Sequence, residues 1–189
     1  MLAAPISKET ASAVPAVVEP PSAPEPASLE GKVILHAGDS MVGGDWGLTR
    51  SLGAKAQAEG ATFKHFTKVS ETISSFDDAG TLRDLLAAHH PDIVIVTLGT
   101  NNTDVPHPEV YAKHIQAIAK RIAPRECWWM GPPIPDTGVG KVIEENCAPC
   151  TYFDGSKLTL DRAKDGIHPN DKGAAKWADE FWTAFRAKR

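Results

Sequence analysis

The chain has 189 residues, 42% of them hydrophobic, with a formal net charge of −4 and a pI near 6.0. This length is enough for one domain with its own hydrophobic core, plus a tail. The acidic balance argues against a nucleic-acid-binding protein, which needs a basic face. The sequence contains no run of about 18 apolar residues, so no membrane span is expected.

Residues 1–29 differ in composition from the rest of the chain. Ala, Pro, Ser, Val and Glu dominate, and five prolines fall between residues 15 and 26. Such a segment buries too little apolar surface to offset its chain entropy, which predicts a disordered Ala/Pro-rich linker over 1–29 and a folded domain over 30–189. The segment lacks the basic start and apolar stretch of a signal peptide. A tether in an exported or anchored protein and a featureless flexible end remain equally open.

From residue 31 onward the pattern alternates between strands and helices. Strands are expected at 33–37, 62–69, 93–98, 126–130 and 151–153, and helices at 48–58, 77–90, 108–123, 142–146 and 171–188. The third of these strands is continuously apolar and β-branched, so it should be buried, whereas the alternating second strand should lie nearer an edge. The alternation predicts an α/β fold with a parallel sheet covered by helices on both faces.

Chemically capable residues follow the expected strands. Gly38-Asp39-Ser40 ends the first strand, Ser70-Glu71-Thr72 follows the second and Gly99-Thr100-Asn101-Asn102 follows the third. Asp165-Gly166-Ile167-His168-Pro169 precedes the last helix. Because the carboxyl ends of parallel strands open onto one crevice, these blocks should meet there.

Together the blocks provide the groups needed for acyl transfer through a serine nucleophile. Ser40 needs a base to accept its proton, and His168 is the candidate. Asp165 can accept the other ring N–H of His168 and so fix its tautomer. The side-chain amide of Asn101 and the backbone N–H of Ser40 are candidates to stabilise the oxyanion.

The three blocks beginning at Gly38, Gly99 and Asp165 resemble those of the SGNH, or GDSL-type, hydrolases. The resemblance runs from about residue 31 to the end, with the family's order and spacing. It implies a flavodoxin-like three-layer α/β/α fold with a five-stranded parallel sheet. It also implies hydrolysis of esters, often acetyl or short acyl groups on carbohydrates, with Ser40 as nucleophile, His168 as base and Asp165 as orienting group.

One position departs from the family pattern. The family usually has glycine after the second strand, and the N–H of that glycine completes the oxyanion hole together with the nucleophile N–H and the asparagine. Here Ser70 takes that place. Its N–H remains available, but its Cβ restricts the backbone and narrows the pocket. A fold that has lost efficient catalysis is therefore a rival interpretation.

The chain has three cysteines. Cys127 and Cys150 begin the fourth and fifth expected strands, which are neighbours in the flavodoxin-like order 2-1-3-4-5, so a bridge between them is favoured and Cys147 is left free. A bridge between Cys147 and Cys150 is the alternative. These two residues also have redox-dithiol spacing, but they precede a strand instead of opening a helix. Only Cys127 is a further candidate zinc ligand.

Other residues have plainer structural interpretations. Asp39 is expected mainly to brace its turn. Trp128-Trp129 should pack in the core and not form a sugar platform. No metal-like partners lie near His89, His90, His107 or His114, and these histidines are expected at the surface or at helix ends. The loop 42–46 is one of three loops, with 103–107 and 134–140, that should determine specificity.

These observations predict a serine ester hydrolase that removes an acetyl or short acyl group from a small-molecule or carbohydrate ester. The alternatives are an O-acyltransferase that uses the same residues and a non-catalytic carbohydrate-binding module. No cofactor, metal or nucleic-acid partner is expected, and the protein should be a monomer. An extracytoplasmic location, secreted, periplasmic or lipid-anchored, is the expectation.

Overall fold

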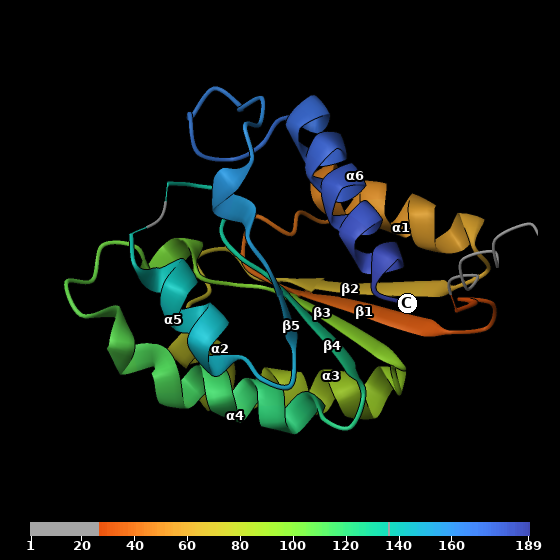
Figure 1. Ribbon diagram of the computed structural model, residues 1–189, viewed down its shortest axis with the longest axis horizontal. Coiled ribbons are helices and arrows are strands. Elements are labelled where there is room, and N and C mark those ends of the chain that lie inside the picture. The colour runs from red at the N-terminus through yellow and green to blue at the C-terminus, as the bar shows by residue number, and fades with distance from the viewer. Residues whose placement is uncertain (1–26, 136) are drawn as a thin grey trace, which may run out of the picture.

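The computed structural model describes residues 27–135 and 137–189. Its centre is a five-stranded, all-parallel sheet in the order β2-β1-β3-β4-β5 (Figure 1). The strands are β1 (Val33–Gly38), β2 (Thr62–Thr67), β3 (Ile93–Thr97), β4 (Glu126–Met130) and β5 (Thr151–Phe153). The predicted sheet is confirmed, and the alternating strand β2 does lie at an edge.

Helices cover both faces of this sheet. They are α1 (Gly47–Ala58), α2 (Ile73–Asp78), α3 (Thr81–His89), α4 (Ala112–Ile122), α5 (Val139–Asn146) and α6 (Asp171–Ala187), with short 3₁₀ turns η1 (Thr100–Asn102), η2 (Pro108–Tyr111) and η3 (Gly155–Lys157). Figure 1 shows α1 and α6 above the sheet and α2 to α5 below it. The three-layer α/β/α architecture predicted from the sequence is confirmed.

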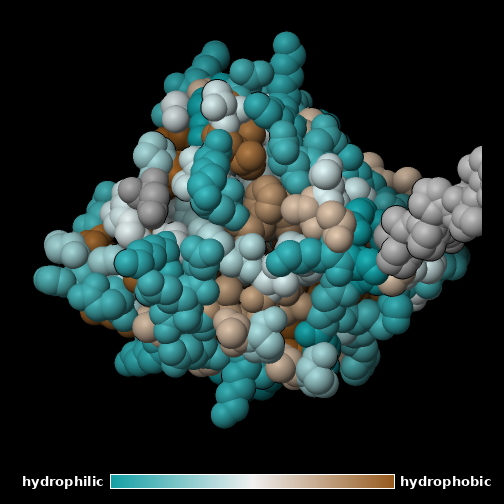
Figure 2. Space-filling view, viewed as in Figure 1, coloured by the Kyte–Doolittle hydropathy of each residue, from teal (hydrophilic) through white to brown (hydrophobic). Residues whose placement is uncertain are grey.

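The two faces of the sheet bury different side chains because successive residues of a strand point to opposite sides. In β3, Val94 and Val96 pack toward α2–α5, whereas Ile93 and Ile95 pack toward α1 and α6. All four are at most 2% exposed. Unlike β2, β3 is apolar from Ile93 to Val96 because both of its faces are covered. The outer surface is mostly hydrophilic on the face that Figure 2 shows.

The helix predicted at 77–90 is in fact two helices, α2 and α3. Gly80 separates them, with a φ of 68° that ends the first helical path. The first helix begins earlier than predicted because Thr72 caps it: its hydroxyl accepts from Ser75 N–H, and Ser75 Oγ accepts from Thr72 N–H. This capping box fixes the chain just after the Ser70 block.

The predicted linker lies, up to residue 26, outside the described residues. Its last part, 27–29, belongs to the folded unit: Ala27 N–H donates to the Arg189 carbonyl, and the side chain of Leu29 is 1% exposed in the core beside α1 and α6. Residues 27–29, predicted as linker, are therefore part of the folded domain. Within the part of the chain that the structure describes, no helix is both long and apolar enough to cross a membrane.

A disulfide joins Cys127 to Cys150 across the neighbouring strands β4 and β5, with Cα atoms 4.4 Å apart. Cys147 is a buried free thiol, and burial raises its pKa to about 11. A thiol held in its neutral form is a poor nucleophile. The Cys147-x-x-Cys150 spacing therefore does not form a redox pair in this structure.

Replacing both Cys127 and Cys150 with alanine should lower the free energy of unfolding by about 3 kcal/mol, because the bridge closes a loop in the unfolded chain. Their sequence separation is 23 residues. Urea unfolding of the variant and of the unreduced wild type measures the difference. Cys147→Ala is the matched control, since it removes a buried thiol and keeps the bridge. A double variant no less stable than this control would contradict the prediction.

Candidate active site

Ser40 lies directly beyond the carboxyl end of β1, at the centre of the sheet. A Cβ at Gly38 would overlap the Thr97 carbonyl, so β1 and β3 can approach this closely only with glycine there. The N–H of Asp39 donates to that same carbonyl at 3.1 Å, and Thr67 Oγ1 donates to the Asp39 carbonyl at 2.7 Å. The turn that carries Ser40 is therefore tied to both neighbouring strands.

Ser40, His168 and Asp165 form a continuous chain of hydrogen bonds. The ring Nε2 of His168 is 2.8 Å from Ser40 Oγ, and its Nδ1 is 2.7 Å from Asp165 Oδ2. A carboxylate only accepts hydrogen bonds, so Nδ1 carries the proton and Nε2 is free to accept the Ser40 hydroxyl proton. Ser40, His168 and Asp165, which were predicted from separate parts of the sequence, thus lie together in the order that nucleophilic catalysis requires.

Asp165 is held as a carboxylate. Its Oδ1 accepts from the backbone N–H groups of Ile167 at 2.9 Å and His168 at 3.0 Å. These bonds, together with the one from the His168 ring, lower the pKa of Asp165 to about 2. Asp165 therefore keeps its charge at neutral pH, which fixes the imidazole tautomer.

Asn101 lies in the 3₁₀ turn η1, which follows β3. Its amide nitrogen donates to the Glu71 carbonyl at 2.9 Å, which fixes the side chain against the loop after β2. An amide nitrogen carries two hydrogens, so one remains for another acceptor. Its neighbour Asn102 has a structural position instead: it is buried, and its Oδ1 accepts from Ile73 N–H at 3.2 Å.

Ser70 has a backbone φ of 59°. This is the left-handed region, which glycine enters freely and other residues enter at a cost. A glycine at this position would adopt the same backbone conformation without that cost. Ser70 is exposed on the loop between β2 and α2.

Ser70→Gly should raise the free energy of unfolding by up to about 1 kcal/mol. The energy gained by relieving the left-handed strain exceeds the entropy cost of ordering the more flexible glycine chain on folding. The value of kcat should change by less than about twofold if Ser70 N–H already serves the site. His90→Gly is the matched control: His90 has a φ of 45° at the end of α3, far along the chain from the site. A tenfold rise in kcat with Ser70→Gly alone would show that serine misplaces the N–H.

Asp39 braces the nucleophile turn, as expected. Its Oδ1 accepts from Met41 N–H at 2.9 Å, and the side chain is fully buried. Burial raises the pKa of this carboxyl from its ordinary value of 3.8 to about 7. Asp39 is not part of the Ser40–His168–Asp165 chain.

The raised pKa of Asp39 predicts that folding favours its protonated form. The stabilisation is complete below pH 4 and is lost as pH rises through about 7. Asp39→Asn cannot ionise and keeps an acceptor for Met41, so its free energy of unfolding should fall less than that of the wild type between pH 4 and pH 7.5. Urea unfolding at both pH values measures this difference. An equal fall in the free energy of unfolding of the wild type and of Asp39→Asn would contradict the raised pKa of Asp39.

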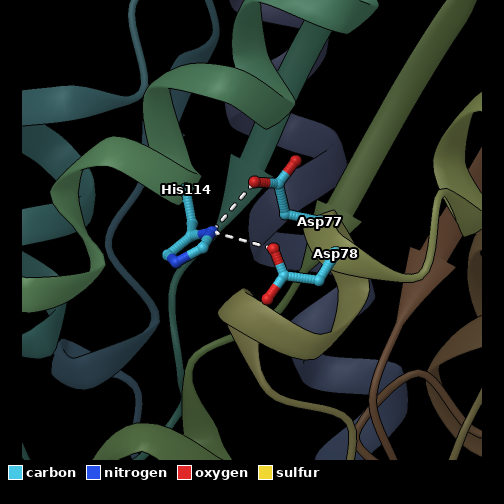
Figure 3. A group of neighbouring side chains, drawn as sticks. All are labelled: Asp77, Asp78 and His114. Carbon is cyan, nitrogen blue, oxygen red and sulfur yellow. Dashed lines mark hydrogen bonds and ion pairs between the residues drawn. The ribbon is translucent and has the colours of Figure 1, made fainter.

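A second titratable cluster lies away from Ser40. His114 Nδ1 is 2.9 Å from Asp77 Oδ2 and 3.8 Å from Asp78 Oδ1 (Figure 3), so the prediction that His114 lacks suitable partners is wrong. Arg121 also donates to Asp77 at 2.8 Å. Despite partial burial, the bonds from Arg121 and His114 lower the pKa of Asp77. The Arg121 guanidinium already pairs with the Asp77 carboxylate and would repel a metal cation bound there. The cluster is therefore an ion-pair network between α2 and α4.

An apolar cleft of about 480 Å³ opens beside Ser40 and His168. Its other walls are the end of β2 with Thr67 and Val69, the glycines before α1, Trp46, and the loop around Ala163 and Pro169. Sequence reasoning placed Trp46 in a specificity loop and gave it no role of its own. A tryptophan between glycines was the available signal.

Solved structures share this fold. The chain matches LAE5, an α/β hydrolase from a Lake Arreo metagenome, with a TM-score of 0.66 and 19% identity over 82% of this chain and 95% of LAE5. It matches the acetylxylan esterase Axe2 of Geobacillus stearothermophilus with a TM-score of 0.65 and 17% identity over 82% of this chain and 94% of Axe2. It also matches a putative lipolytic protein of the G-D-S-L family from Desulfitobacterium hafniense, with a TM-score of 0.61 and 19% identity over 79% of this chain and 97% of that protein. No family model and no curated protein sequence matches.

These identities are low, and the likeness establishes the architecture. The chain has the α/β fold found in GDSL-type esterases, as the sequence resemblance implied.

Proposed function

We propose that the protein is a serine ester hydrolase of the SGNH type. The observation that carries this proposal is the chain from Ser40 Oγ through His168 to Asp165, with links of 2.8 and 2.7 Å. Two of the structural neighbours are catalytic mutants of Axe2, one lacking an aspartate and one a histidine three positions later, the same spacing as Asp165 and His168.

The reaction would proceed in two halves. Ser40 Oγ attacks the ester carbonyl carbon while its proton passes to His168 Nε2, and the oxyanion is stabilised by Asn101 and the Ser40 N–H. His168 then gives that proton to the alcohol oxygen as the C–O bond breaks. Water attacks the acyl-serine, again losing a proton to His168, and the collapse returns the proton to Ser40 and releases the carboxylic acid.

Hydrolysis of 4-nitrophenyl acetate, combined with labelling by a fluorophosphonate, tests the proposal. We expect turnover and a single modified residue, Ser40. If neither turnover nor labelling is seen, in the wild type or in Ser70→Gly, the binding-module alternative is favoured. Adding a sugar alcohol and measuring how the acyl group partitions between water and sugar separates a hydrolase from an O-acyltransferase.

We also propose an extracytoplasmic location. A disulfide between Cys127 and Cys150 supports it, since such bridges persist in oxidising compartments. Alkylation of unreduced cells of the source organism should leave both cysteines unmodified. Modification of both would place the protein in a reducing compartment.

A further inference from the structure

We propose that Trp46 is the platform of a carbohydrate-binding subsite that receives the alcohol side of the substrate, a neutral oligosaccharide carrying the ester. This proposal rests on the proposed hydrolase function and names its substrate class. Trp46 is 55% exposed, whereas the other four tryptophans of the chain are at most 8% exposed. Val69 is 74% exposed and lines the same cleft as Trp46, and a shared exposed apolar surface of this kind marks a binding site.

The indole of Trp46 is held in place by its own loop. Gly43 and Gly47 have positive φ values of 73° and 64°, which turn the chain tightly on either side of the tryptophan. A Cβ at Gly43 would lie 3.6 Å from the ring, and one at Gly44 would lie 3.7 Å from its Nε1. The ring therefore packs over a bare glycine backbone, and the platform is formed before any ligand binds.

The direction of the reaction decides which half of the ester lies against Trp46. The carbonyl oxygen must face Asn101, and the alcohol oxygen must face His168 Nε2, which protonates it. The 480 Å³ cleft is lined by Ser40, His168 and Trp46 but not by Asn101. The alcohol therefore leaves into this cleft, along the walls that Trp46 provides.

A second cleft, of about 580 Å³, continues on the other side of Trp46. Besides the tryptophan, Ala163 and Pro169 line both clefts. The second cleft adds polar groups that the first lacks: Asp161, Asn170, Asp171 and Lys172. An apolar wall that leads into a polar hollow fits a chain of sugar rings, which present C–H faces to an aromatic ring and hydroxyls to polar side chains.

The charges of the second cleft favour a neutral sugar. It contains the carboxylates of Asp161 and Asp171 and the ammonium group of Lys172, and the Asp171 carboxylate is also 3.4 Å from the guanidinium of Arg50. Asp165 adds another negative charge to the cleft beside it. With Arg50 counted, the charges of Asp161, Asp171 and Lys172 sum to zero, so the second cleft has no net positive charge to attract a phosphorylated or uronic-acid chain. Hydroxyl groups can both donate to the carboxylates and accept from the lysine.

Iodide quenching of tryptophan fluorescence tests the subsite without using catalysis. Because Trp46 is the exposed tryptophan, it should account for most of the quenching, and Trp46→Ala should remove that part. Xylotetraose, cellotetraose and N-acetylchitotetraose are the probes. At least one of them should protect the wild type at millimolar concentration. Lack of protection by all three would overturn the proposal and leave the hydrolase assignment intact.

Kinetics provides the second test. The ratio of kcat/KM for the acetylated form of the protecting tetrasaccharide to that for ethyl acetate should fall roughly tenfold in Trp46→Ala, the size expected for a lost aromatic contact. Trp46→Phe should restore most of the ratio. Val110→Ala is the matched control, because Val110 is 53% exposed and lines neither cleft.

Octyl acetate identifies a different occupant. An equal loss for octyl acetate and for the acetylated sugar in Trp46→Ala would mean that the cleft binds alkyl chains, and would overturn the carbohydrate assignment. Lys172→Ala should weaken only the tetrasaccharide ester and spare the acetylated monosaccharide. A wild type inactive on every ester, ethyl acetate included, would instead refute the proposed hydrolase function.

Discussion

Replacing Ser40 with alanine should lower kcat for 4-nitrophenyl acetate by at least about 10⁴-fold, because the covalent route loses its nucleophile. Ser40 is partly buried in the turn after β1, and its Oγ makes the 2.8 Å contact with His168. The change removes one oxygen at the cleft, so the folded state should be retained. Steady-state kinetics and thermal unfolding, measured together, separate lost chemistry from lost folding.

Ser51→Ala is the matched control for this prediction. Ser51 lies in α1, whose neighbouring loop carries Ser40, but it belongs to neither cleft described here. Its variant should keep wild-type turnover and remain labelled by the fluorophosphonate. If Ser40→Ala retained a tenth of wild-type activity, or if the label moved to another serine, the assignment of the nucleophile would be wrong.

Strand order and layering were predictable because burial leaves a direct trace in the sequence. β3 is covered on both faces and is apolar from Ile93 to Val96, while β2 lies at an edge and alternates. The break between α2 and α3 was harder to predict. Gly80 and the cap at Thr72 determine where the helix breaks. In the sequence, the leucines of α3 continue the apolar spacing of one helix, so the pattern does not indicate a break.

The hydrogen-bonded chain of Ser40, His168 and Asp165 was predictable because two local rules coincide. Nucleophile turns follow central strands, and Asp165 and His168 are three residues apart, so that one carboxylate can accept from the backbone and the ring of the same turn. The conformation of Ser70 left no such trace. A positive φ at a serine is decided by the loop it closes, here the one leading to the capped helix α2.

The exposure of Trp46 could not be deduced from sequence because exposure is a property of the assembled surface. Trp128 and Trp129 stand in a strand pattern and are buried, as predicted. Trp46 has no periodic neighbours, and only the folded loop shows that it separates two clefts. Likewise, His114 and Asp77 are 37 residues apart in the sequence, and they meet only because α2 packs against α4.

Asn101→Ala should lower kcat by roughly 10²–10³-fold, the usual cost of removing one oxyanion donor. One amide hydrogen of Asn101 is bound to the Glu71 carbonyl at 2.9 Å, which aims the rest of the group without using it up. KM should change much less, because the donor meets charge that develops only in the transition state. Loss of the Glu71 bond should cost about 1 kcal/mol of stability.

Asn101→Asp sharpens this test. Aspartate has nearly the same size but replaces both N–H donors with a negative charge, so its kcat should fall at least as far as that of the alanine variant. Asn146→Ala is the control, since Asn146 ends α5 and donates to the Val142 carbonyl of its own helix. If Asn101→Ala lowered kcat less than about threefold, or raised KM and left kcat unchanged, Asn101 would be a binding residue and the oxyanion would need another donor.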